Sequence, residues 1–184
     1  MSISTREQLK THIHSIHDYL RNSGAGYGMT AMKIFGFLYG LKTIEPLISK
    51  PEFVTTINKE LCKFSNLANL FDDSQEEFND PIRSISIRIG NILKEFEKEP
   101  KLKRYLHYQI PEHIDNEIWH KLIEMVNQIP INAKYNENVN LSGKVYEYFI
   151  GRDSTAISEL GAYFTDRNIT NYIFDKGIGG KLAC

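Results

Sequence analysis

The residues whose types and spacing are best suited to chemistry lie at positions 161–165, Gly-Ala-Tyr-Phe-Thr. Thr165 is a good N-cap for a following helix, because its hydroxyl can accept a hydrogen bond from a free amide of the first turn. Aromatic side chains and a hydroxyl beside a free helix N-terminus can receive a small anionic group such as a carboxylate. An ordinary bend from one helix into another has the same pattern, so both interpretations stay open.

Two helices are needed to position this loop. The segment from Asn140 to Asp175 is typical of a helix, a glycine-started aromatic loop and a second helix. In the second helix, apolar side chains recur at helical spacing and predict one buried face. They are Ile169, Tyr172 and Ile173.

A family resemblance rests on this segment. Gly143, Tyr146, Glu147 and Tyr148, followed by residues 161–165 before a helix, resemble the start of the catalytic domain of adenine-specific DNA methyltransferases. The similarity is greatest to the modification subunits of type I restriction systems. The family places a Gly-x-aromatic-aromatic-Thr-Pro segment along the pocket for S-adenosylmethionine.

The resemblance implies a role for each matching residue. Tyr163 and Phe164 are expected near the cofactor, and Thr165 is expected to bond its methionine carboxylate. The chain departs from the family at Asp166, where proline is usual. The charge of Asp166 would repel a cofactor carboxylate that came close.

Two motifs that the family needs for catalysis are missing. Asn79-Asp80-Pro81 is not followed by the second proline and the aromatic residue of the Asn-Pro-Pro-aromatic motif. The glycines at 177–180 follow no apolar strand, so they do not match the Gly-rich cofactor loop. We therefore expect a helical N-terminal domain at 1–138 and the truncated start of a catalytic domain at 139–184. We assign no catalytic and no metal-binding residue.

The composition agrees with a folded protein that has no strong charge. Hydrophobic residues make up 41% of the 184 residues, enough for a sizeable core, and the net charge of −1 shows no basic excess for nucleic acid. The two cysteines have no zinc or disulfide spacing. The first residues lack the basic and then apolar run that is typical of a signal peptide, and the apolar stretch at 31–41 is too short to span a bilayer. We expect a cytoplasmic protein without a membrane segment.

Apolar periodicity predicts a mainly α fold, a bundle of about five helices with a C-terminal helix–loop–helix extension. The five helices are expected over 4–22, over 29–47, from Pro51 through Phe64, from Asp80-Pro81 through Phe96, and from Asp115 to Pro130. Either Ser4 with Glu7 or Thr5 with Gln8 can form the first capping box.

The helix at 29–47 is apolar nearly all round, so we expect it to be the central one. Gly36 and Gly40 would let a neighbouring helix come close. Lys33 and Lys42 would each need a route to water.

Several other groups have a functional and a plain interpretation. The histidines at 14 and 17 could bind a metal, but a solvated or partner-facing polar edge is favoured because no further ligand completes a site. Cys62 fits a small core residue better than a nucleophile. The basic and aromatic run at 98–108 fits a solvated helix end better than a nucleic-acid surface, because glutamates stand beside it. The glycines at 24–28 fit a connector better than a phosphate loop.

These observations lead to one main hypothesis about function. The chain is the N-terminal part of an S-adenosylmethionine-dependent, adenine-specific DNA methyltransferase, with an incomplete cofactor site and no activity alone. DNA and a specificity or other methyltransferase subunit are the expected partners. The alternative is a non-catalytic α-helical interaction module derived from such an enzyme. An unrelated metal- or nucleotide-dependent enzyme is the third possibility, and no motif favours it.

Overall fold

A computed structural model of the chain describes residues 3–51, 56–69, 85–99, 114–131 and 141–151. All regular elements in these ranges are helices, so the predicted mainly α fold is confirmed. They are α1 (Arg6–Asn22), α2 (Gly28–Ile48), α3 (Phe64–Ala68), α4 (Ile85–Glu97), α6 (Asn116–Asn127) and α7 (Leu141–Ile150).

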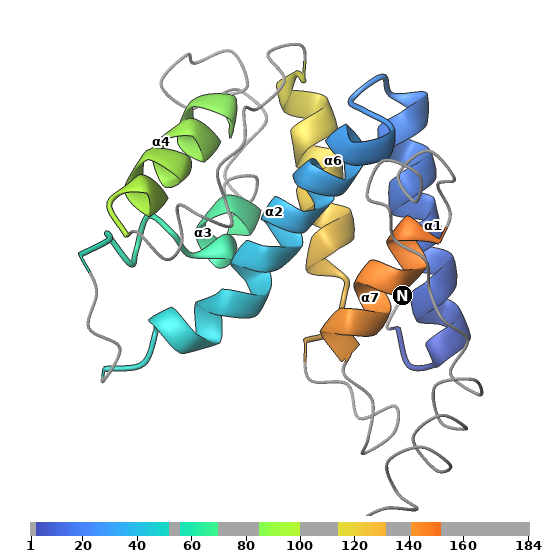
Figure 1. Cartoon of the computed structure of the whole chain (residues 1–184), viewed down its shortest axis with the longest axis horizontal. Helices are drawn as coiled ribbons and strands as arrows, with labels where there is room; N and C mark the ends of the chain where they lie inside the picture. Colours follow the sequence, from blue (N-terminus) through green and yellow to red (C-terminus); the bar gives the residue numbers. More distant parts are fainter. Residues whose placement is uncertain (1–2, 52–55, 70–84, 100–113, 132–140, 152–184) are drawn as a thin grey trace, which may run out of the picture.

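Helix α2 crosses the middle of the molecule, and α1, α3, α6 and α7 all contact it (Figure 1). The predicted central helix is therefore confirmed. Helix α6 lies beside α2 and also contacts α1, α3 and α4. The apolar faces of all six helices meet in one core, in which Ile16, Phe35 and Trp119 are at most 1% exposed.

The predicted starts of α1 and α6 are also confirmed, although α6 ends at Asn127, before Pro130. Of the two possible capping boxes, the structure forms the one between Thr5 and Gln8, and Asp115 accepts a hydrogen bond from the Ile118 amide as the cap of α6. Gly24 follows the last turn of α1 with φ of 73°, a left-handed conformation that glycine adopts without strain. Residues 23–27 thus form the expected connector between two helices.

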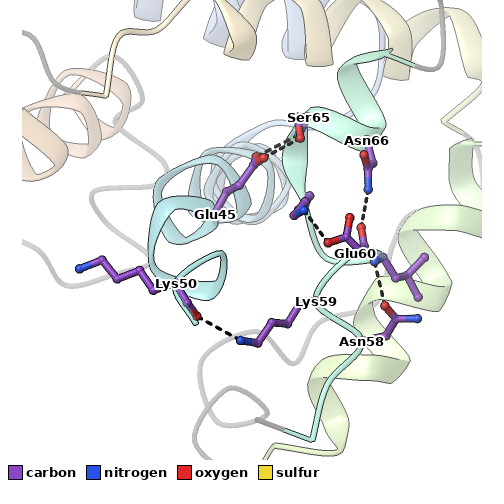
Figure 2. Close-up of polar contacts among 9 residues, drawn as sticks. Glu45, Lys50, Asn58, Lys59, Glu60, Ser65 and Asn66 are labelled. Carbon is purple, nitrogen blue, oxygen red and sulfur yellow. Dashed lines mark hydrogen bonds and ion pairs between the residues drawn. The ribbon is translucent and has the colours of Figure 1, made fainter. Parts of the chain in front are cut away.

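The third helix was predicted wrongly. Turns occupy positions 59–62, and only the short helix α3 follows (Figure 2). The Asn58 side chain accepts a hydrogen bond from the Leu61 amide, and the Asn66 side chain donates to the Glu60 carbonyl. Such local side-chain bonds offer the backbone an alternative to the helix. The apolar positions still face inward, because Ile57 and Phe64 are buried.

The position of Lys42 also differs from the prediction that its side chain reaches water. Instead of reaching water, its side chain is buried and ends among the last carbonyl groups of α6. The Lys42 Nζ atom donates to the Val126 oxygen at 3.1 Å, to the Ile129 oxygen at 2.7 Å, and to the Asn127 oxygen. Lys33, on another face of α2, is exposed as expected.

Glu45 binds the start of α3 in a similar way. Its carboxylate accepts hydrogen bonds from the Ser65 amide at 3.0 Å and from the Ser65 hydroxyl at 2.5 Å (Figure 2). The first amides of a helix have no partner within the helix, so a carboxylate there stabilises it. One turn of α2 therefore provides a cation for the end of α6 and an anion for the beginning of α3.

A double-mutant cycle on Glu45→Ala and Ser65→Ala tests this contact. Each single change should lower the free energy of unfolding by about 1–2 kcal/mol, because it removes a hydrogen-bond partner from a partly buried group. The two losses should add only in part, since both changes remove the bond between the Ser65 hydroxyl and the Glu45 carboxylate, whereas the bond from the Ser65 amide survives in Ser65→Ala. Urea denaturation measures both. Strict additivity would contradict the contact.

Candidate functional site

The residues predicted to bind the cofactor, Tyr163, Phe164 and Thr165, lie outside the described residues. The first part of the same motif, Gly143 to Tyr148, lies inside them on α7. The geometry of the candidate site is therefore the geometry of α7 and of the surface that holds it.

Helix α7 packs against α1 and α2 through one apolar face (Figure 1). Val145 and Phe149 stand one helical turn apart and are at most 1% exposed. Both belong to the same core as the buried residues of α1 and α2. The helix that begins the motif is thus part of the helical body.

A cluster of rings joins the three helices. Phe149 of α7 stacks on Phe35 of α2, with ring centroids 4.3 Å apart and planes 3° from parallel. The rings of His17 in α1 and Phe149 are T-shaped, with centroids 5.3 Å apart. Tyr146 meets Tyr39 edge-on at 5.6 Å. Offset stacks and edge contacts are the favourable ring geometries, so this cluster fixes how α7 is rotated.

Tyr146 also makes the close approach that Gly36 was predicted to allow. Its hydroxyl donates to the Gly36 carbonyl at 3.4 Å, and a Cβ atom at Gly36 would lie 3.7 Å from the Tyr146 ring. Burial, with a smaller effect of Tyr39, raises the pKa of Tyr146 to about 12. At Gly40 a Cβ atom would meet nothing within 4 Å in the described part of the chain, so the same expectation was wrong there.

Polar contacts also hold α7, and they involve the buried Lys144. The Lys144 Nζ atom lies 2.7 and 2.5 Å from the two Glu147 carboxylate oxygens and 5.9 Å from the centre of the Tyr148 ring. The Tyr148 hydroxyl accepts a hydrogen bond from the Arg6 Nε atom of α1 at 2.6 Å. That bond raises the pKa of Arg6. Glu147 and Tyr148 therefore have structural partners here.

Sequence reasoning missed Arg6 and Lys144. The spacing of Lys144 and Glu147, three positions apart on a helix, was a usable signal for an ion pair. No signal pointed to Arg6, which is 142 positions from Tyr148.

Of the two histidines favoured for a solvated or partner-facing polar edge, His14 is partly exposed, whereas His17 does not belong to such an edge. His17 is buried against Phe149, with its Nδ1 atom 3.8 Å from an Asp18 carboxylate oxygen. His12 contacts the Met125 carbonyl of α6 through Nε2 at 2.7 Å. Among the described residues no group of three or more histidine, cysteine or acidic side chains could hold a metal ion.

The other two candidate groups agree with their plain interpretations as far as the structure describes them. Cys62 is fully buried, and burial raises the pKa of its thiol to about 11, so it fits a core residue. Lys98 pairs with Glu95 of the same helix end. Residues 100–108 of the basic and aromatic run lie outside the described residues.

No known protein-family model, curated protein or solved structure gives a significant match to this chain. Among the described helices, none is both long and apolar enough to cross a membrane.

Truncating Phe149 to alanine tests the ring cluster. Phe149→Ala should lower the free energy of unfolding by about 3–5 kcal/mol, because it removes a stacked ring from the core and leaves a cavity. Tyr148→Phe on the same helix is the matched control, since it removes only a partly exposed hydrogen bond, and should cost less than about 1 kcal/mol. Equal losses in chemical denaturation would show that the cluster does not hold α7.

The raised pKa of Tyr146 predicts a loss of stability in alkali. Between pH 10 and 12 the unfolded chain releases the phenol proton while the folded chain keeps it, so a rise in pH favours unfolding. The wild type should therefore lose about 1 kcal/mol more than Tyr146→Phe between pH 9 and pH 11. Urea titrations at both pH values measure this, and tyrosinate absorbance should show one late-titrating group that the variant lacks. Identical pH profiles would contradict the prediction.

Proposed function

We propose that this chain is the N-terminal helical part of an S-adenosylmethionine-dependent, adenine-specific DNA methyltransferase. Its body holds the start of the catalytic domain, contributes part of the cofactor pocket, and offers surface to DNA or to a specificity subunit. The observation that supports this most is the packing of α7. A ring cluster and polar contacts hold the helix that carries Gly143 to Tyr148 against α1 and α2.

Such packing suits the chemistry of methyl transfer. The reaction is an in-line displacement at a sulfonium carbon, so the donor and the amine must be held in a narrow range of distance and angle. Binding groups keep such geometry best when they follow rigid, well-packed elements. Helix α7 ends at Ile150, and the proposed cofactor residues follow 13 to 15 positions later in the chain.

In this proposal each cofactor residue has a distinct part. Tyr163 and Phe164 provide apolar rings beside the cofactor. Thr165 provides the hydroxyl and the helix start that receive the methionine carboxylate. The groups that polarise the adenine amine belong to the Asn-Pro-Pro-aromatic motif, which is absent from these 184 residues. The chain alone should therefore bind the cofactor weakly and transfer no methyl group.

Cofactor binding to the isotope-labelled chain tests the proposal. S-adenosylhomocysteine should shift the amide resonances of residues 161–167 with a dissociation constant of about 1 mM, the weak affinity expected of a partial site. A Tyr163→Ala, Thr165→Val double variant should lose these shifts. Tyr27→Ala, which changes an exposed tyrosine on the helical body, should keep them.

The same titration decides between this proposal and the interaction module. Absence of any shift at residues 161–167, at about ten times that concentration, would contradict a cofactor role and leave the non-catalytic module. Shifts that persist in the double variant would show that binding occurs elsewhere.

A further inference from the structure

Three backbone carbonyl oxygens converge on one point inside the protein. They belong to Val126, Asn127 and Ile129, at and just beyond the end of α6. The ammonium group of Lys42 lies at that point and donates a hydrogen bond to each of them. Its side chain is buried, and the ring of Phe64 lies 5.7 Å from the Nζ atom.

The end of a helix is a natural place for a positive charge. The last carbonyls of α6 have no donor within the helix, and the aligned peptide dipoles give them a partial negative charge. An ammonium group has three N–H donors, which equals the number of carbonyls that face it. Glu45, which lies on the same helix as Lys42, also interacts with it electrostatically.

We propose that these three carbonyls form a binding site for a monovalent cation, either a primary ammonium or an ion of similar size such as potassium. Lys42 is the ion that fills it, attached to the chain through its own side chain. Because the ammonium group is attached to the chain, it does not lose the translational entropy that a free ion would lose on binding. Once the lysine side chain is removed, the carbonyl cage should accept a free cation from solution.

Lys42→Ala with added cations tests this directly. The variant lacks three carbons and the nitrogen, which are the heavy atoms of propylammonium. We expect its melting temperature to fall by about 5–10 °C, because three carbonyls lose the ammonium donor, although that of Val126 keeps the Ile129 amide as a donor. Propylammonium should then restore about half of the loss in a saturable way, as ligands that bind only the folded state do.

Two comparisons separate the possible cations from general salt effects. Tetramethylammonium at equal concentration has the charge but neither the N–H groups nor the size, so it should restore nothing. Rescue by propylammonium alone would show that the cage requires N–H donors, and rescue by potassium as well would show a general cation site. If neither exceeds tetramethylammonium, the proposal is wrong. Lys33→Ala, an exposed lysine of the same helix, should show no loss and no cation response.

A measurement on the wild type covers the case in which Lys42→Ala does not fold. Burial lowers the pKa of Lys42 to about 8, so at pH 6 the group carries its full charge. Its ammonium protons should exchange slowly with water, and the Nζ nucleus should show scalar couplings through the hydrogen bonds to the carbonyl carbons of residues 126, 127 and 129. Rapid exchange without such couplings would overturn the proposal.

Discussion

The arrangement of this protein depends on the burial of α2. A helix that is apolar nearly all round must be covered on several sides, and α1, α3, α6 and α7 provide that cover. Covering it buries Val126 and Ile129 at the end of α6 and partly buries Ser65 at the start of α3, where free peptide groups have less access to water. Lys42 and Glu45, one turn apart on α2, supply the missing partners. The central helix thus supplies hydrogen-bond partners to the peptide groups that lose water when it is buried.

The last described helix belongs to this same core. The stacking of Phe149 on Phe35 and the contact of Tyr146 with Gly36 join α7 to α2, while Arg6 joins it to α1. A catalytic domain that starts at residue 139, as proposed, would begin with a helix that is packed into the helical body. The body would then hold the helix that precedes the cofactor loop in the chain.

The motif residues of α7 also help to hold the helix in place. Tyr146, Glu147 and Tyr148 belong to the segment that resembles a methyltransferase, and each also makes a structural contact. Substitutions at these positions therefore affect stability as well as any cofactor binding. Tyr163 and Thr165 are better choices for functional tests, because the proposal gives them a direct contact with the cofactor.

The sequence by itself determined the helical class, the central helix, the capping residues of α1 and the start of α6 at Asp115. These follow from apolar spacing and from side chains that bond to their own neighbours, which are properties of short stretches. It was wrong at 59–62, where local hydrogen bonds of Asn58 compete with a periodic pattern. Only the tertiary structure decided the partners of Lys42, His17 and Tyr148. Those partners lie 84 to 142 positions away in the chain, and they come into contact only once the helices have packed.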